Sequence, residues 1–97
     1  MKTLSEMIQS DKPVLVDFSA EWCGPCKKMS PVLKDLKKDV KEDVTILKVD
    51  IDKNPQAAQL YNVQSVPTLI IFQKGTIKWR QSGVIGIREL QQVLNQL

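Results

Sequence analysis

Apolar residues in this chain gather in short runs that are typical of strands. Four segments have this pattern: residues 14–18, 44–51, 68–72 and 77–82. The first, Val14-Leu15-Val16-Asp17-Phe18, is almost unbroken, which is typical of a strand covered on both faces. The second segment alternates. Val44, Ile46 and Lys48 would point to one face of the sheet, and Thr45, Leu47 and Val49 to the other. The last two runs flank Gln73-Lys74-Gly75-Thr76, which predicts a β-hairpin.

Between these runs, apolar residues recur at helical spacing. Thr3-Leu4-Ser5-Glu6 fits a capping box at the start of a short helix. A long helix is predicted from Cys26 to Val40 and a final one over residues 87–97. Asn54-Pro55 predicts an N-cap and first turn of a short helix that continues through Tyr61. This alternation of helices and strands predicts an α/β fold, with a layered sheet that contains one antiparallel pair.

Length and composition exclude several classes of protein. The 97 residues allow one compact domain, 1–97, and fractions of 42% apolar and 26% charged residues are those of a globular protein. A net charge of +3 is too small and too scattered to indicate nucleic-acid binding. The chain has no histidine and two cysteines, which excludes histidine bases and zinc sites with histidine ligands. No apolar run has the length of a signal peptide or a membrane span, so we expect a cytosolic, metal-free protein with reduced thiols.

The two cysteines lie in Trp22-Cys23-Gly24-Pro25-Cys26, between the first strand and the long helix. Their spacing brings the sulfur atoms together across one helical turn, within reach of a disulfide. Cys23 stands where unpaired backbone N–H groups and the positive end of the helix dipole stabilise a thiolate. Lys27 and Lys28 add positive charge nearby. Because the thiolate is the nucleophile, this setting predicts disulfide exchange.

Other interpretations of the cysteine pair are weaker. A structural disulfide across so short a loop would stabilise the fold by only about 2 kcal/mol. A structural zinc ion would need two further soft ligands, and the chain contains no third cysteine and no histidine. Chance pairing of two buried thiols would leave their position at the start of a helix unexplained.

The motif, extended to Lys27, resembles the active-site signature of the thioredoxin family letter for letter. Further family segments occur at matching distances: Val16-Asp17-Phe18, Asn54-Pro55, Val66-Pro67-Thr68 and Gly83. The resemblance runs from about Lys12 to the C-terminus. It implies the thioredoxin fold, reduction of disulfides in target proteins, and recharging by thioredoxin reductase, a flavoprotein that uses NADPH. It implies no bound cofactor, because the redox group is the Cys23–Cys26 disulfide.

The resemblance also implies roles for single residues. Asp17 would lie behind the cysteines as the proton acceptor for Cys26, with Lys48 on the neighbouring strand as its charge partner. Burial in an apolar strand would raise the pKa of this carboxyl group. The Val66-Pro67 bond would be cis, with Pro67 facing the cysteines. The apolar rim that binds substrate would consist of Trp22, Gly24, Pro25, Val66, Pro67, Gly83 and Val84.

The chain departs from the family in two places. Ser19 stands where many bacterial members carry tryptophan, which would alter packing beside the site. The chain also starts late, so that the first family strand is largely missing. We therefore expect a central mixed sheet of four strands with residues 44–51 at one edge, unless Met1 to Thr3 pair with it. We also expect a monomer, because Lys48, Asp50 and Lys53 protect this edge from pairing with another chain.

The leading functional prediction is a general protein-disulfide reductase. Cys23 would attack a target disulfide and Cys26 would resolve the mixed disulfide. Two alternatives remain at this level. One is a disulfide oxidant or isomerase, although such branches of the superfamily tend to carry a histidine between the cysteines. The other is a protein-binding module whose docking is regulated by its redox state.

Overall fold

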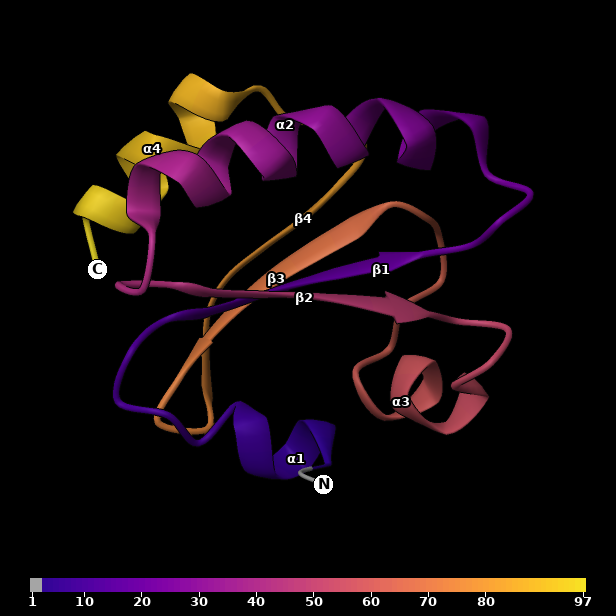
Figure 1. The fold of residues 1–97 in the computed structure, drawn as a ribbon. Helices are drawn as coiled ribbons and strands as arrows, with labels where there is room; N and C mark the ends of the chain where they lie inside the picture. The colour runs from indigo at the N-terminus through magenta and orange to yellow at the C-terminus, as the bar shows by residue number, and fades with distance from the viewer. Residues whose placement is uncertain (1–2) are drawn as a thin grey trace.

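The computed structural model describes residues 3–97, which form one mixed sheet between two pairs of helices (Figure 1). Within this range the sheet has four strands: β1 (Val14–Ser19), β2 (Thr45–Asp50), β3 (Thr68–Gln73) and β4 (Thr76–Ser82). Their order is β2-β1-β3-β4, with β1 parallel to β2, antiparallel to β3, and β3 antiparallel to β4. The predicted α/β class, the four strands and the edge position of β2 are confirmed. A pairing of Met1 and Lys2 with this edge lies outside the described residues, and Thr3 is a helix cap.

The helices are α1 (Leu4–Met7), α2 (Gly24–Val40), α3 (Pro55–Leu60) and α4 (Ile87–Asn95). Figure 1 shows α2 and α4 on one face of the sheet and α1 and α3 on the other. The predicted capping box is present, because the Glu6 backbone N–H donates to the Thr3 hydroxyl at 3.2 Å and the Glu6 carboxylate accepts from the Thr3 backbone. None of the helices within residues 3–97 is long and apolar enough to cross a membrane.

The predicted N-cap of α3 has the expected position but lacks the expected hydrogen bond. Asn54 does occupy the N-cap position of α3, followed by Pro55 at the first turn, but its side chain makes no capping hydrogen bond. The Asn54 amide instead donates to the carbonyl oxygen of Asp50 at 3.0 Å. The side chain therefore ties the loop back to the end of β2, and α3 begins without a side-chain acceptor.

The core has two apolar layers that meet across β1 and β3. Leu15, Leu69 and Ile71 point to the layer under α2 and α4, together with Leu36 and Leu90. The intervening residues point to the layer over α1 and α3: Val14, Val16, Phe18, Ile70 and Phe72. Every residue of β1 is buried, which confirms the prediction that its almost unbroken apolar run is covered on both faces of the sheet. The alternation of β2 is confirmed as well, because Ile46 packs in the first layer and Leu47 and Val49 in the second.

The predicted hairpin joins β3 and β4 through a two-residue loop between Gln73 and Thr76. Its central residues, Lys74 and Gly75, have φ angles of 53° and 80°, which suit a tight hairpin turn. The Gly75 N–H donates to the carbonyl oxygen of Ile8 at 2.9 Å, so the turn is fastened to the end of α1. A Cβ at this position would lie 2.6 Å from the Gln9 side chain, which gives glycine a second reason beyond its φ.

The core supports a stability prediction for Phe72. Its side chain is 1% exposed, and its ring meets the Tyr61 ring edge-on with the centroids 5.1 Å apart. Phe72→Ala should lower the free energy of unfolding by about 3–5 kcal/mol, because it removes these contacts and leaves a cavity. Ile77→Ala is the matched control, since Ile77 is 44% exposed on β4 and should change stability by less than about 1 kcal/mol. Urea denaturation of both variants measures the difference, and equal losses would contradict this assignment of the core.

Candidate active site

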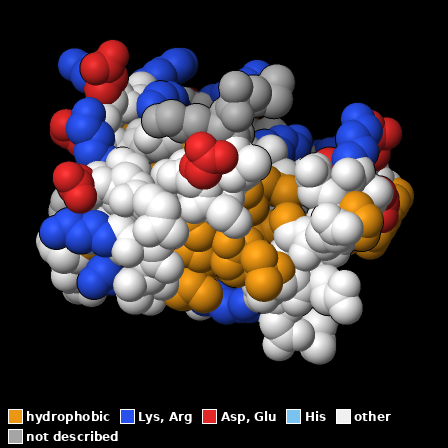
Figure 2. Space-filling model, turned by 90° about the horizontal axis from the view of Figure 1, so that it is seen from below, with side chains coloured by type: hydrophobic (Ala, Val, Ile, Leu, Met, Phe, Trp, Pro, Cys, Tyr) orange, Lys and Arg blue, Asp and Glu red, His pale blue; other side chains and the backbone are white. Residues whose placement is uncertain are grey.

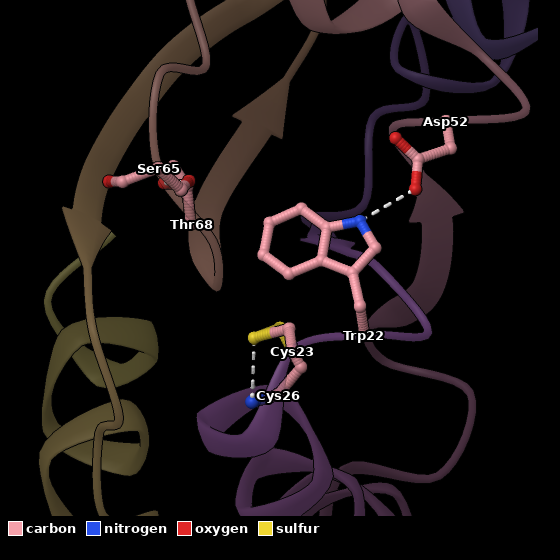
Figure 3. Close-up of a disulfide and its surroundings, with 6 residues drawn as sticks. All are labelled: Trp22, Cys23, Cys26, Asp52, Ser65 and Thr68. Atoms are coloured by element: carbon pink, nitrogen blue, oxygen red, sulfur yellow. Dashed lines mark hydrogen bonds between the residues drawn. A yellow bond between two sulfur atoms is a disulfide. The ribbon is translucent and has the colours of Figure 1, made fainter.

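The two cysteines lie at the junction of β1 and α2. Cys23 is the N-cap of α2, Gly24 begins the helix, and Pro25 occupies its first turn. Cys23 and Cys26 form a disulfide, with their Cα atoms 5.3 Å apart (Figure 3). The backbone N–H of Cys26 donates to the Cys23 sulfur atom at 3.1 Å. The sulfur of Cys23 thus occupies the position that a capping oxygen normally takes, at the positive end of a helix of 17 residues.

The two cysteines do not differ in exposure in this oxidised form. Both side chains are 3% exposed. The reason is that both sulfur atoms pack in a small apolar cluster with Ala20, against Ile51 and Val66. What distinguishes Cys23 in this structure is its hydrogen bond from the helix N-terminus.

The segment that contains Val66 and Pro67 lies near this cluster, beside the segment that follows β4. The Val66–Pro67 peptide bond is cis, as the resemblance implied, and Val66 packs against the cysteine cluster. The N–H of Gly83 donates to the carbonyl oxygen of Pro67 at 2.8 Å, which joins this segment to the end of β4. Gly83 has a φ of 98°, a conformation that favours glycine.

The proposed rim residues differ in how far they reach solvent. Trp22 is 69% exposed and Val84 is 48% exposed, while Gly24 and Pro25 are exposed at the start of α2. Val66 and Gly83 are half-buried, and Pro67 is buried. Trp22 and Val84 therefore expose apolar area on two different segments, one before α2 and one after β4.

Asp17 lies in the middle of β1 and is fully buried. Among the described residues, neither of its carboxylate oxygens has a hydrogen-bond partner. This burial raises the pKa of Asp17 to about 6, and the charge of Lys48 partly offsets the rise. Lys48 stands opposite Asp17 in the β1–β2 register but is itself exposed. The predicted charge partner is therefore in place, acting across a distance and without a salt bridge.

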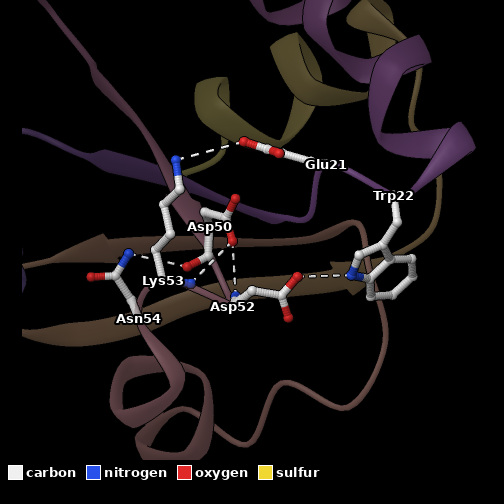
Figure 4. A network of polar contacts seen from close by, with 6 residues as sticks. All are labelled: Glu21, Trp22, Asp50, Asp52, Lys53 and Asn54. Carbon is white, nitrogen blue, oxygen red and sulfur yellow. Dashed lines mark hydrogen bonds and ion pairs between the residues drawn. The ribbon is translucent and has the colours of Figure 1, made fainter.

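Asp52 is a residue beside the site that the sequence analysis missed. The indole N–H of Trp22 donates to the Asp52 carboxylate at 2.8 Å, across 30 positions of the chain (Figure 3). Asp50 holds the loop that carries Asp52, because its carboxylate accepts from the N–H groups of Asp52 and Lys53 at 2.8 and 3.2 Å (Figure 4). The Lys53 Nζ also lies 3.6 Å from the Glu21 Oε1; because both side chains are exposed, this ion pair contributes little to stability. The indole of the exposed Trp22 is thus tied to the β2–α3 loop.

Met29 is a second residue near the site whose contact the sequence analysis did not predict. Its side chain is fully buried. Its sulfur atom, however, also accepts a hydrogen bond from the backbone N–H of Ile85 at 3.3 Å. This contact fixes the segment that carries Gly83 and Val84 to the second turn of α2. A buried thioether is a weak acceptor, but here it satisfies a buried N–H group.

The chemistry that this arrangement supports is thiol–disulfide exchange. Within residues 3–97, no group of three or more histidine, cysteine or acidic side chains could hold a metal ion. A buried carboxylate, an apolar rim and a reversible pair of sulfur atoms are the parts that such an exchange uses.

Comparison with known proteins identifies the same chemistry. The sequence profile of the family described as Thioredoxin matches residues 2–96. "Thioredoxin 1" of Chlorobaculum tepidum is 40% identical, over 94% of this chain and 91% of the relative. "Thioredoxin" of Mycobacterium bovis is 43% identical, over 96% of this chain and 84% of the relative. "Thioredoxin" of Rickettsia typhi is 39% identical, over 95% and 88% of the two chains.

The raised pKa of Asp17 predicts how stability depends on pH. Between pH 4 and pH 6 the folded state binds more protons than the unfolded state, so stability should fall as the pH rises through the folded pKa of about 6. The loss in the wild type should reach about 3 kcal/mol by pH 8. Asp17→Asn, which removes the titrating group, should not show this loss, and its stability relative to the wild type should rise between pH 4 and pH 8. Urea midpoints of both proteins at the two pH values measure it; equal pH dependence would show that Asp17 does not titrate with a raised pKa.

Proposed function

Because this chain belongs to the thioredoxin family and is a dithiol–disulfide reductase, we propose that it divides this chemistry between a nucleophilic Cys23 and a resolving Cys26. The observation that supports this division is the backbone N–H of Cys26, which points at the Cys23 sulfur from the first turn of α2. The same N–H group and the helix dipole would stabilise a thiolate on Cys23 in the reduced protein. Lys27 and Lys28, both exposed in the first turns of α2, add positive charge.

The proposed reduction of a target disulfide has two steps. First, the Cys23 thiolate attacks one sulfur of the target disulfide; the target S–S bond breaks, and one target thiolate leaves. Second, Cys26 loses its proton and attacks the Cys23 sulfur, which expels the second target thiolate. The target gains two electrons, and the Cys23–Cys26 disulfide re-forms.

Asp17 is the proposed acceptor of the Cys26 proton. Its carboxylate is buried and lacks a hydrogen-bond partner among residues 3–97, so it can take up a proton without breaking another contact. A pKa of about 6 leaves it ionised at neutral pH yet more basic than an ordinary aspartate. Lys48 keeps that pKa from rising further, which maintains the ionised form.

Targets would bind across the apolar rim formed by Trp22, Gly24, Pro25, Val66, Pro67, Gly83 and Val84. Trp22 and Val84 supply exposed apolar area, and Asp52 and Met29 hold the two loops that carry them. Disulfide-containing proteins are the substrates, and thioredoxin reductase is the proposed partner that returns the disulfide to the dithiol. We further propose that the protein acts as a monomer in the cytoplasm, where the thiol pool suits a reductant.

Trapping experiments test the division of roles. Cys26→Ser should form a stable mixed disulfide through Cys23 with a reducible target such as insulin, because the resolving thiol is absent. Cys23→Ser should form none, and both variants should lose catalytic turnover. Non-reducing electrophoresis with mass mapping identifies the bridged cysteine. Accumulation of an adduct on Cys26 of the Cys23→Ser protein, with none on the other variant, would reverse the assignment.

A further inference from the structure

The edge strand β2 exposes backbone groups that no described strand pairs with. The N–H groups of Thr45 and Ile51 donate to Pro13 and Ser19 at 3.0 and 2.9 Å, toward β1. Because successive residues of a strand face opposite sides, the N–H and C=O groups of Ile46 and Lys48 point away from β1. The N–H of Asp50 does the same, while its carbonyl accepts from Asn54. The sheet order ends at β2, so among residues 3–97 this row of groups is open to an added strand.

An apolar groove borders this edge on the side of α1 and α3. It encloses about 790 Å³; its apolar lining includes Leu4, Met7, Leu47, Val49, Leu60 and Tyr61, and polar residues such as Lys48, Lys53 and Asn54 also border it. Leu60, on α3, is 68% exposed, close to the value for Trp22 in the rim. Figure 2 shows apolar side chains open to solvent in the middle of this face of the molecule. Apolar side chains that enter the groove from an added strand would therefore be favoured.

A second hollow borders the same edge on the side of α2, with a different chemistry. It encloses about 340 Å³ and is lined by Leu33, Ile46 and Leu47, by Asp17 and Ser30, and by the lysines at positions 34, 37 and 48. Lys37 donates to the carbonyl oxygens of Lys41 and Val44, and the other two lysines are exposed. Since Asp17 is buried, positive charge dominates the rim of this hollow. Side chains that enter it from an added strand would be favoured if they were acidic.

We propose that the β2 edge is a docking site for an extended segment of a partner protein in which apolar and acidic residues alternate. The segment would pair with Ile46, Lys48 and Asp50 as a fifth strand of the sheet. Successive side chains of an added strand point to opposite faces, so apolar ones would fill the α1–α3 groove and acidic ones would reach the lysine rim. This site is separate from the apolar rim around the disulfide. It approaches the disulfide at Ile51, which packs against the cysteine cluster, and its α2 side is lined by Asp17 and Lys48.

A second copy of this chain fits the edge less well than such a partner. Two β2 strands related by a two-fold axis would place the α2 sides of both copies together. The lysine rims would then face each other, and like charges across paired strands are destabilising. An acidic segment meets the same lysines with favourable charge, which is why the proposal names a partner and not a dimer.

The test uses a capped eight-residue peptide of alternating valine and glutamate, without cysteine, added to the ¹⁵N-labelled protein. The amides of Ile46, Lys48 and Asp50 should shift and become protected from hydrogen exchange. Lys34→Glu should weaken binding about two- to fivefold by reversing one charge at the rim. Leu60→Ser should weaken it about fivefold by removing apolar area from the groove. Ile77→Ser on the opposite edge is the matched control and should leave the affinity unchanged.

Several results would overturn the proposal. Amides of Ile46, Lys48 and Asp50 that are already protected in dilute free protein would mean that the edge is covered. Protection that grows with protein concentration would assign the edge to a second copy. Peptide-induced shifts confined to the rim around Trp22, or equal binding of a valine–lysine peptide, would also contradict it. Disulfide reduction by the Leu60→Ser protein should remain at the wild-type rate, so this test and the test of the redox mechanism fail independently.

Discussion

The burial of β1 on both faces is the constraint on which the site depends. Helices pack against each side of the sheet, and every residue from Val14 to Ser19 is buried, so the strand has no freedom to shift its register or direction. The chain leaves the sheet at Ala20 and must enter α2 within a few residues. This short path puts Cys23 at the N-cap and Cys26 one turn later. Cys23 is thus positioned by the core and by the helix N-terminus together.

The same constraint explains why Asp17 is unusual. A carboxylate in the middle of a strand covered on both faces cannot reach water, and no described residue donates a hydrogen bond to it. Burial of this carboxyl group raises its pKa to about 6 and lowers the stability of the fold at neutral pH. Lys48 can moderate this effect only because β2 lies directly beside β1, with the two residues in register.

Local sequence patterns predicted most of the fold. Apolar runs located all four strands, and Thr3 with Glu6 located the start of α1, because strand burial and helix capping depend on residues that are close in the chain. The Gly75 turn and the position of the cysteine pair are local in the same sense. The roles of Asp17, Lys48 and Pro67 required the family resemblance as well, since a buried aspartate has no local signature.

Contacts between distant segments were not predictable in this way. Trp22 donates a hydrogen bond to Asp52 across 30 positions, and Met29 accepts one from Ile85 across 56 positions. Neither Asp52 nor Ile85 stands in a recognisable motif. Asn54 has the residue type and position of a cap, yet its amide is taken by Asp50 because the end of β2 comes close. The equal exposure of the two cysteines likewise depends on how Val66 and Ile51 pack against them.

The central claim, that the N-cap position makes Cys23 the reactive sulfur, can be tested directly by competitive alkylation. The reduced protein is treated briefly with iodoacetamide near neutral pH, and the labelled cysteine is identified by peptide mass mapping. The account predicts that Cys23 is modified at least about tenfold faster than Cys26, because only its thiolate is stabilised by the helix N-terminus. Equal labelling of the two cysteines, or faster labelling of Cys26, would contradict it.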